Sequence, residues 1–371
     1  MAIEAALGRI LAHDVMNHGP VPAAARSAMD GYAVRCADAD AGRRLSAKAE
    51  IRIGQPAGAG LTPGCAIRVS TGGLLPEGCD AVVPAEHVAE HADGIVVEQA
   101  PTPGQHIVAR GSDLEAGSTL LRAGRHLRCS DIGLLAAIGR DCVNVYRRPQ
   151  IGVLSTGNEI VPPGREALPW QTYDSNRYVV GAALTAWGAL PVQFPLVRDD
   201  PGELRRALQR ALAACDGVVL SGGSSISDHD VTAAAVRSIP GAQVAVHGVK
   251  MKPGRPALLA SAGTKPIIGL PGNPTAAFIA LCVLARPLVR RLAGIESDAI
   301  DSPSYSVGNP IVGKRGWDCF VPVAVDREFV YPLPMCSSHV GTFAGAAGFV
   351  HVPPTSAQLE VGSRVSVTLT P

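Results

Sequence analysis

Residues 148–295 alternate between short apolar runs and amphipathic helical patterns, and this alternation constrains the fold more than any other feature. Residues 151–155, 218–220 and 266–270 are apolar runs of strand length. Between them, residues 201–214 place apolar side chains at a helical period. Strands that alternate with helices favour a parallel sheet with helices on both faces. We therefore predict a central, Rossmann-like α/β domain built on a parallel sheet.

The segments on either side of this domain have sequence patterns that are typical of small β domains. Their short β-like runs are interrupted by turn residues, in a chain that contains 41 Gly and 30 Pro. We predict an α/β multidomain chain in which β-rich domains flank the central sheet. The predicted parts are a linking subdomain of 1–20 with 110–147, a β-rich lobe at 21–109, the parallel-sheet domain at 148–295 and a small C-terminal β domain at 296–371.

Polar residues mark where two of the helices are expected to begin. Ser130 or Asp131 is a candidate N-cap for a helix that Gly139 ends. Asp174 with Ser175 is a candidate cap for a second helix. The predicted apolar face of that second helix consists of Val179, Val180, Ala183, Leu184 and Trp187.

Charge and cysteine content exclude several classes of protein. The 371 residues carry 33 Lys and Arg against 32 Asp and Glu, so no global field draws the chain to nucleic acid or to an anionic membrane. The nine cysteines are scattered and form no CxxC pair, which is typical of reduced thiols. The N-terminus lacks the pattern of a signal peptide, and the most apolar stretch, 276–285, is too short to span a bilayer. We expect a cytoplasmic protein without nucleic-acid or membrane partners.

Polar, glycine-rich turns follow three of the predicted strands, at the edge where parallel sheets bind ligands. Such turns expose backbone N–H groups ahead of a helix, so they suit a phosphate or another oxyanion. Glu159, Asp228 and Asp230 add carboxylates, which favours a Mg²⁺ ion shared with the phosphate. One such turn is more often structural, but three in one domain make a ligand site as plausible as a structural role. The turns are 155–159, 221–230 and 271–274.

The segment 250–256 places Lys250, Lys252 and Arg255 on a backbone that proline and glycine restrict. One interpretation is a solvated turn between strands. The other is a clamp for a polyanion, in which the arginine binds bidentately. The residues by themselves leave both interpretations open.

Three short motifs in the β-rich part favour plain turns when each is taken alone. Asp30 precedes a glycine, and Thr71 and Asp113 lie in similar glycine-containing segments. The ten histidines show neither HxH nor HExxH spacing, so the sequence does not indicate a transition-metal site.

Several segments, in this order, resemble the molybdopterin molybdenumtransferase family (the MoeA and gephyrin E-domain type). The resemblance covers nearly the whole chain, and MDGYA, STGxE and LPGNP at these separations are very specific to the family. The segments are SAMDGYAV at 27–34, PAG with LTPGCAIRVSTGGLLPEGCDAVVPAEHV at 56–88, RGSDLEAGSTLLRAGRHL at 110–127, IGVLSTGNEI at 151–160, YDSNRYVV at 173–180, SGGSSISDHD at 221–230, MKPGRP at 251–256 and GLPGNP at 269–274.

The resemblance implies an enzyme of molybdenum cofactor biosynthesis. Its implied substrates are molybdate and adenylylated molybdopterin, its implied cofactor is Mg²⁺, and its implied products are AMP and the finished cofactor. It also implies an elongated homodimer with four subdomains per subunit. The active cleft would then lie between the parallel-sheet domain of one subunit and the β domain of the other.

The resemblance and the strand-end turns together predict the site residues. The predicted catalytic residues are all acidic, and Glu159 and Asp230 among them are the predicted Mg²⁺ ligands. The catalytic set is Asp30, Asp113, Glu159, Asp199 and Asp230. The predicted substrate-binding set is Thr71, Ser221, Gly222, Gly223, Lys252, Arg255, Pro271, Gly272, Asn273 and Pro274.

The chain departs from the family pattern at several positions. Asn158 replaces an aspartate, Ser227 replaces a glycine, Arg255 replaces a lysine, and the sequence begins later than members usually do. Two alternative functions therefore stay open. One is a catalytically impaired paralogue or scaffold that binds molybdopterin. The other, disfavoured by the MDGYA motif and the two β domains, is a molybdopterin adenylyltransferase.

Overall fold

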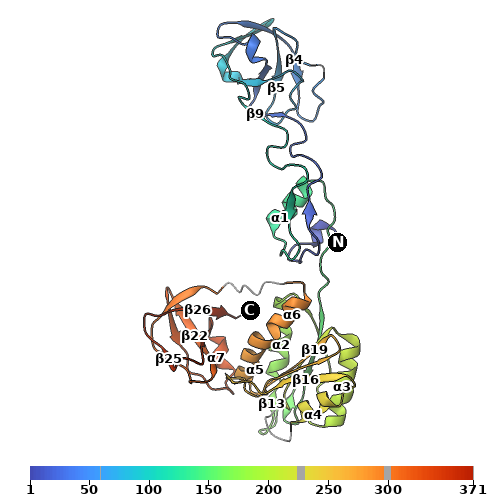
Figure 1. The fold of residues 1–371 in the computed structure, drawn as a ribbon, viewed down its shortest axis with the longest axis vertical. Coiled ribbons are helices and arrows are strands. Elements are labelled where there is room, and N and C mark those ends of the chain that lie inside the picture. The colour runs from blue at the N-terminus through green and yellow to red at the C-terminus, as the bar shows by residue number, and fades with distance from the viewer. Residues whose placement is uncertain (59, 224–229, 296–301, 371) are drawn as a thin grey trace. The chain divides into compact units, whose positions relative to one another are not determined.

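The structure is a computed structural model that describes residues 1–58, 60–223, 230–295 and 302–370. The chain forms two compact units, Met1–Asn144 and Val145–Pro371 (Figure 1). The second unit contains the predicted α/β domain together with a second six-stranded sheet near its C-terminus. The finer division into four parts stays a prediction.

The first unit is built around a six-stranded sheet in the order β6-β3-β5-β4-β8-β7. Apolar side chains from its strands, with Leu45 and Ile95 fully buried, form its core. Shorter strands pair elsewhere in the unit, β1 with β10 and β2 with β9. The sheet strands are β3 (Gly31–Val34), β4 (Arg44–Ile51), β5 (Cys65–Val69), β6 (Ala81–Pro84), β7 (Val88–His91) and β8 (Gly94–Val97), and the short pairs are β1 (Val15–Met16), β10 (Thr119–Leu121), β2 (Arg26–Ser27) and β9 (Ile107–Val108).

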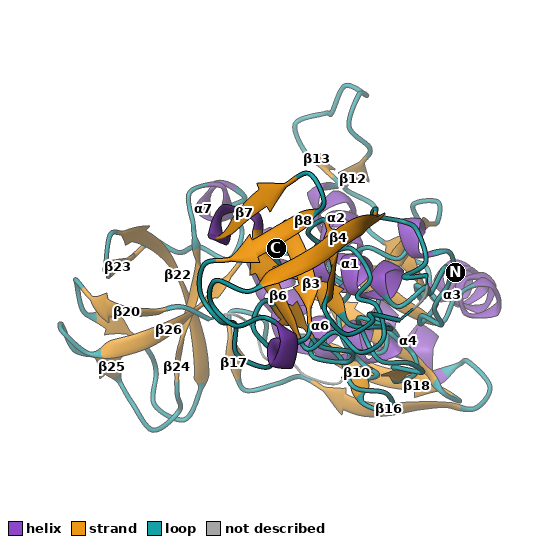
Figure 2. Cartoon of the chain, turned by 90° about the horizontal axis from the view of Figure 1, so that it is seen from above, coloured by secondary structure: helices purple, strands orange, loops and turns teal. Residues whose placement is uncertain are grey.

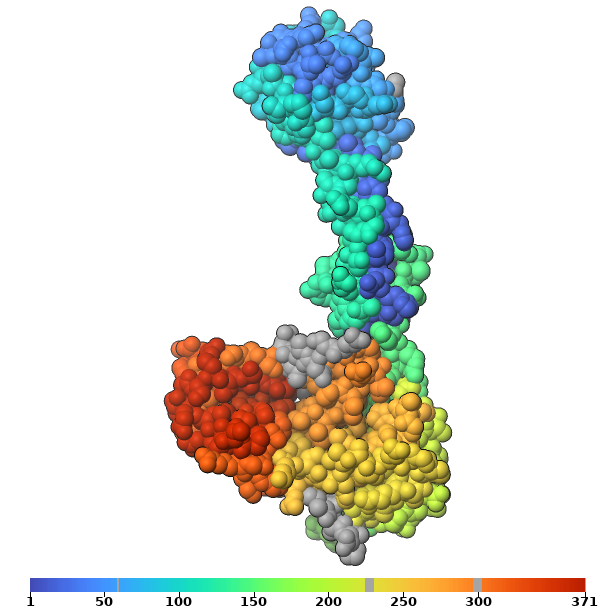
Figure 3. Space-filling model, viewed as in Figure 1, coloured from blue at the N-terminus to red at the C-terminus, as the bar shows by residue number. Residues whose placement is uncertain are grey.

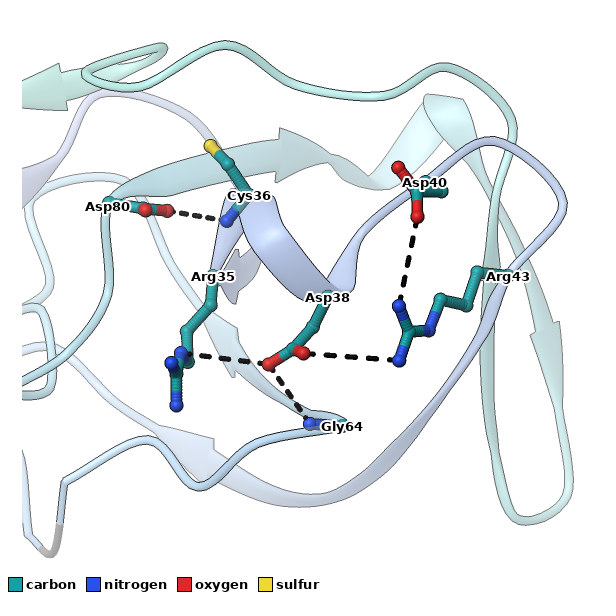
Figure 4. A network of polar contacts seen from close by, with 7 residues as sticks. All are labelled: Arg35, Cys36, Asp38, Asp40, Arg43, Gly64 and Asp80. Carbon is teal, nitrogen blue, oxygen red and sulfur yellow. Dashed lines mark hydrogen bonds and ion pairs between the residues drawn. The ribbon is translucent and has the colours of Figure 1, made fainter.

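A polar network fastens the 3₁₀ turn η2 (Cys36–Asp38) to the sheet of the first unit (Figure 4). The Asp38 carboxylate accepts the Gly64 N–H at 3.1 Å, and it lies 3.6 Å from Arg35 and 4.0 Å from Arg43. Because the carboxylate is mostly buried, these donors compensate the loss of its hydration. The network therefore holds Gly64, the residue just before β5, in place beside η2.

Helix α1 (Cys129–Ala137) begins earlier than the sequence predicts. Its N-cap residue is Arg128, so the prediction of Ser130 or Asp131 as the cap is wrong. Asp131 lies in the first turn instead, where its carboxylate accepts the Arg128 N–H at 2.9 Å. The predicted end is confirmed, because Gly139 follows the helix with a φ of +74°.

The central sheet of the second unit has the order β14-β11-β15-β19-β18-β16. Its first four strands are parallel, as predicted, whereas β18 runs antiparallel to both of its neighbours, β19 and β16. Residues 263 and 264 alone connect β18 to β19, and so short a connection joins only antiparallel strands. The strands are β11 (Gln150–Ser155), β14 (Leu190–Gln193), β15 (Gly217–Ser221), β16 (Ala242–His247), β18 (Leu258–Ala262) and β19 (Lys265–Leu270).

Helices cover both faces of this sheet (Figures 1 and 2). Ile151, Val153 and Ile268 face the helices α2, α5 and α6, whereas Leu154 and Leu220 face α3 and α4. This alternation follows from the period of two along each strand. The helices are α2 (Ser175–Ala186), α3 (Pro201–Ala214), α4 (Val231–Arg237), α5 (Pro274–Ala280) and α6 (Arg286–Leu292).

Two of the predicted helices differ in detail from expectation. The long helix predicted at 274–292 is divided by a π-helical turn, η4 (Leu281–Ala285). Pro287 follows that turn, and its missing N–H and bulky ring disturb the α-helical hydrogen bonds of the preceding turn. In α2, the Asp174 cap is confirmed by a 3.1 Å bond from the Arg177 N–H. Val179, however, is exposed rather than part of the apolar face.

The C-terminal part of the second unit is a sheet in the order β17-β22-β23-β20-β26-β24. Its surface, red in Figure 3, adjoins the yellow and orange surface of the α/β part. Phe349 of β24 packs into the same core as α2 and α5. No helix of the described residues has the length and apolar character needed to cross a membrane. The elements are β17 (Met251–Lys252), β20 (Ser304–Val307), β22 (Asp318–Asp326), β23 (Phe329–Pro332), α7 (Gly341–Ala344), β24 (Gly348–Val352) and β26 (Arg364–Leu369).

Candidate functional site

A cavity of about 1000 Å³ lies in the second unit, at the carboxyl ends of the parallel strands. Its walls come from the ends of β11, β15 and β19, from the N-termini of α2 and α5, and from the segment 251–256. The C-terminal part adds a further wall from Lys314, Trp317 and the segment 335–340. The cavity therefore lies where an open parallel sheet is expected to bind a ligand.

Two serine hydroxyls lie at the inner ends of neighbouring strands. Ser155 of β11 and Ser221 of β15 are partners in the parallel register, so their side chains share one face of the sheet. Both residues are buried, at 2% and 5% exposure, and both line the cavity. We call this pair the serine floor. It makes this part of the cavity lining polar but uncharged.

Gly222 continues the chain from the serine floor in a conformation that favours glycine. Its φ is +94°, and a Cβ at this position would lie 2.0 Å from the carbonyl oxygen of Thr156. The turn thus requires both the backbone freedom and the small size of glycine. Any side chain at this position would collide with the backbone that follows β11.

The N-terminus of α2 is joined to the turn before α5. Asn176 donates from Nδ2 to the carbonyl oxygen of Gly272 at 2.9 Å, and both residues line the cavity. Its side-chain oxygen is not used in that bond. The bond fixes two separate loops of the cavity wall against each other.

Another part of the cavity lining carries positive charge. Lys252, Arg255 and Lys314 line the cavity together with Trp317. Lys314 Nζ lies 4.8 Å from the centre of the Trp317 ring, and the Arg255 guanidinium carbon lies 5.7 Å from it. Both distances are within the range of a cation–π interaction. We call these four residues the cation wall, and their charge favours a polyanion over the solvated turn as the role of 250–256.

The C-terminal segment of the cavity is hydrogen-bonded to the start of α5. Thr275 donates from its N–H to Ser337 O at 3.1 Å and from Oγ1 to His339 O at 2.7 Å. Asn273 Nδ2 lies 3.3 Å from Ser337 Oγ. These bonds hold residues 335–340 beside the glycine turn, so the C-terminal part belongs to the site.

Nine of the predicted site residues line this one cavity. They are Glu159, Ser221, Gly222, Lys252, Arg255, Pro271, Gly272, Asn273 and Pro274. Asp199, Gly223 and Asp230 belong to the same unit but are absent from its described lining. The predicted loop residues Ser227 and Asp228 lie outside the described part of the chain.

Asp230 is placed as the N-cap of α4. Its Oδ1 accepts the Ala233 N–H at 2.7 Å, and its Oδ2 lies 2.8 Å from Nε2 of His247 on β16. The residue is 5% exposed. Both carboxylate oxygens are thus engaged within the chain, which is the arrangement of a helix cap.

Asp199 and Gly223 both lie close to Thr156, a residue of the cavity lining. Asp199 Oδ1 accepts the Thr156 hydroxyl at 2.8 Å, and its N–H donates to Asn158 Oδ1 at 3.3 Å. A Cβ on Gly223 would lie 3.5 Å from the same Asp199 oxygen. Asp199 therefore positions the turn that follows β11.

In the first unit, Asp30 and Thr71 are in direct contact. The Asp30 carboxylate accepts the Thr71 N–H at 2.7 Å and the Thr71 hydroxyl at 3.1 Å. These hydrogen bonds hold the pKa of Asp30 below its usual 3.8, because they favour the ionised form. Asp113 is also exposed in this unit, where its N–H donates to Val21 O.

The two predicted Mg²⁺ ligands, Glu159 and Asp230, differ in how accessible their carboxylates are from the cavity. Glu159 is exposed and lines the cavity, so its carboxylate is available to a cation shared with a substrate phosphate. Asp230 does not present a comparable carboxylate to the lining. Among the described residues, no group of three or more acidic, His or Cys side chains is arranged to hold a metal ion. Magnesium therefore stays a prediction, with Glu159 as its better-placed ligand.

Sequence reasoning missed several residues of the cavity. Ser155, Asn176, Lys314, Trp317 and Ser337 all line it. Ser155 and Asn176 stand inside segments that match the family pattern, so their place beside Glu159 and Asp174 was a usable signal. Lys314 and Trp317 lie far along the chain, and nothing in their local sequence indicates the contact with Arg255.

Comparison with known proteins agrees with this geometry. Residues 1–139 match the family model described as MoeA N-terminal region (domain I and II), and residues 152–291 match the one described as probable molybdopterin binding domain. A molybdopterin molybdenumtransferase of Nostoc sp. is 36% identical over 78% of this chain and 68% of its own. Molybdopterin molybdenumtransferase 2 of Mycobacterium tuberculosis is 31% identical over 98% of this chain and 92% of its own.

The solved structures lead to the same family. The crystal structure of the molybdopterin biosynthesis MoeA protein from Pyrococcus horikosii is 34% identical to this chain. It covers 100% of this chain and 93% of its own, with a TM-score of 0.90. The resemblance noted in the sequence is therefore confirmed, and the chain belongs to the molybdopterin molybdenumtransferase (MoeA) family.

Proposed function

We propose that this protein inserts molybdenum into molybdopterin during molybdenum cofactor biosynthesis. The observation that carries the proposal is the cavity at the carboxyl ends of β11, β15 and β19. It lies largely within the segment that matches the molybdopterin binding domain, and nine predicted site residues line it. Curated relatives of 31% and 36% identity bear the name molybdopterin molybdenumtransferase.

The chemistry of the walls supports an anionic substrate with a neutral, hydrogen-bonding portion. The cation wall supplies Lys252, Arg255 and Lys314 for phosphate or molybdate oxygens. The turns at Gly222 and Gly272 let the backbone approach the ligand closely. Adenylylated molybdopterin combines a pyrophosphate link with two heterocycles. The pyrophosphate suits the cation wall, and the heterocycles suit the uncharged, hydrogen-bonding parts of the lining.

The finer parts of the proposal are the cofactor, the second substrate and the assembly. When bound, Mg²⁺ would act as a Lewis acid that polarises the phosphorus of the pyrophosphate link. Glu159 would hold it, and the cation wall would orient molybdate. A homodimer would supply Asp30, Thr71 and Asp113 from a second copy, as the family resemblance implies.

The test is a purified assay with adenylylated molybdopterin, molybdate and Mg²⁺. It measures release of AMP and incorporation of molybdenum. Lys252→Ala should lower kcat/KM by about 10- to 100-fold, because a charged hydrogen bond to the substrate is lost. Lys48→Ala is the matched control, since Lys48 is exposed on β4 and lies outside the cavity lining.

The outcomes separate the competing functions. Molybdenum incorporation that depends on Lys252 and not on Lys48 supports the proposal. Transfer of AMP from ATP onto molybdopterin would instead identify an adenylyltransferase. Binding of molybdopterin without any turnover would identify a scaffold or an impaired paralogue.

A further inference from the structure

The serine floor contains a buried hydroxyl whose hydrogen-bonding capacity is unused. Ser155 Oγ is buried and makes no hydrogen bond to any residue that the structure describes. The residue is 2% exposed and lines the cavity. A buried polar group without a partner destabilises a fold, so such a group in a cavity wall calls for a ligand.

The position of Ser155 makes a purely structural explanation weak. Ile151 and Val153 precede it on the same face of β11 and pack in the core against α2 and α5. An apolar side chain at 155 would continue that core, whereas the hydroxyl interrupts it. Its strand neighbour Ser221 places a second hydroxyl on the same face of the sheet, and Ser221 also lines the cavity.

The type of ligand follows from how the cavity distributes its charge. The cation wall is formed by Lys252, Arg255 and Lys314, so the anionic groups of a ligand belong there. The serine floor is uncharged, and each of its hydroxyls both donates and accepts hydrogen bonds. It therefore suits the edge of a planar heterocycle, on which donors and acceptors alternate.

We propose that the serine floor binds the edge of a heterocyclic ring of the substrate, with Ser155 Oγ donating to a ring acceptor. This inference rests on the proposed function, because adenylylated molybdopterin carries two such rings. Pterin and adenine share the required edge chemistry. The Asn176 side-chain oxygen, which is not used in the bond to Gly272, lines the same cavity and offers a further acceptor. Ser155 is a binding residue and takes no part in bond breaking.

The test compares binding and stability in the full-length protein. Calorimetric titration with 6-hydroxymethylpterin and, separately, with AMP distinguishes the two rings. Ser155→Ala should weaken one of these probes about tenfold, because one hydrogen bond is lost. The same substitution should leave the melting temperature unchanged or raise it, since it removes an unsatisfied buried hydroxyl.

Ser238→Ala is the matched control, because it removes a serine hydroxyl that is hydrogen-bonded and lies away from the cavity lining. Its hydroxyl donates to Ala235 O at 2.6 Å at the end of α4, and the residue is absent from the described cavity lining. This variant should lower the melting temperature and leave both affinities unchanged. A loss of pterin affinity in Ser155→Ala places the pterin at the floor, and a loss of AMP affinity places adenine there.

Two results would overturn the inference. One is wild-type affinity of Ser155→Ala for both probes, and the other is a lower melting temperature with unchanged binding. These results are distinguishable from failure of the proposed function. A protein that binds the probes through Ser155 but incorporates no molybdenum would retain the floor and lose the proposed activity.

Discussion

Gly222 is the residue at which a single added methyl group should disturb the site most. Its φ of +94° and the 2.0 Å approach of a Cβ to Thr156 O act together. We expect Gly222→Ala to destabilise the second unit by about 1–3 kcal/mol more than Gly164→Ala. Gly164 is the matched control, because its φ is +87° and a Cβ there meets nothing within 4 Å. Equal melting temperatures of the two variants would contradict this expectation.

The Asp30–Thr71 contact makes a prediction about pH. The pKa of Asp30 is lowered first by the Thr71 N–H and second by the Thr71 hydroxyl. A lowered pKa means that this contact stabilises the fold above the usual 3.8 and that its contribution is lost as the pH falls through the lowered value. Thr71→Val removes only the hydroxyl, so the pKa should rise part of the way to 3.8. Thr71→Ser retains a hydroxyl and should leave the pKa low, as measured by NMR titration of the carboxyl carbon.

Helix α4 depends on its cap at Asp230. Asp230→Ala should cost about 0.5–2 kcal/mol, because the Ala233 N–H loses its acceptor. Asp230→Asn should retain most of that stability, since asparagine caps helices as well as aspartate does. Chemical denaturation measures both effects.

The same asparagine variant also tests the predicted metal role of this carboxylate. A stable Asp230→Asn protein that has lost Mg²⁺-dependent turnover would support the role. Full turnover would restrict it to Glu159.

Helix α1 is held by a nearly buried carboxylate. Asp131 accepts two bonds from Arg125, at 2.8 and 3.0 Å, and one from the Arg128 N–H. The Arg125 guanidinium is the main reason that the pKa of Asp131 lies below 3.8. Asp131→Asn should therefore destabilise the first unit by about 1.5–3 kcal/mol at pH 7. The difference from wild type should shrink as the pH falls below the usual 3.8 and through the lowered pKa of the wild-type carboxylate.

An exposed ion pair serves as the control for Asp131. Asp93 pairs with Arg44, and both side chains are more than half exposed. Asp93→Asn should cost less than about 1 kcal/mol at any pH, because solvent screens the pair. A larger loss for Asp93→Asn than for Asp131→Asn would show that burial is not the cause.

Local sequence patterns predicted elements where one physical signal dominates. Helix α3 has a strong apolar period and a capping aspartate, and its predicted bounds of 201–214 are those observed. The π-helical turn η4 was missed, because a turn of this kind depends on the packing around Pro287 as well as on the proline itself. The reversed direction of β18 in the central sheet was missed because neither β16 nor β18 carries a periodicity that distinguishes strand direction.

At the scale of the molecule, the two units have separate apolar cores. Leu45 and Ile95 are buried in the first unit, and Leu184 and Leu208 in the second. Units with separate cores unfold separately unless a large interface couples them. We expect calorimetry to resolve two transitions, one lowered by Asp131→Asn and the other by Gly222→Ala. A single transition that both variants lower would contradict this expectation.

The candidate site could be predicted only as far as its motifs are local. The turns at Glu159, Gly222 and Gly272 follow strands, so the topology of a parallel sheet placed them together in advance. The segment of Ser155 could place it near the site, but its burial and its unpaired hydroxyl could not be predicted, because both are properties of the folded surroundings. Lys314 and Trp317 could not be assigned, since their contact with Arg255 joins segments far apart in the sequence.

Strand β17 has a consequence for what can be removed from this chain. Met251 and Lys252 pair with Asp318 and Cys319 of β22, so the lysine is carried by a strand of the C-terminal sheet. A shortened protein that ends before β22 would keep every glycine turn and yet leave that lysine without its support. The C-terminal sheet therefore supports part of the cavity lining and cannot be removed without affecting the site. Any engineered version that is to keep the charged segment in place must therefore keep β22 as well.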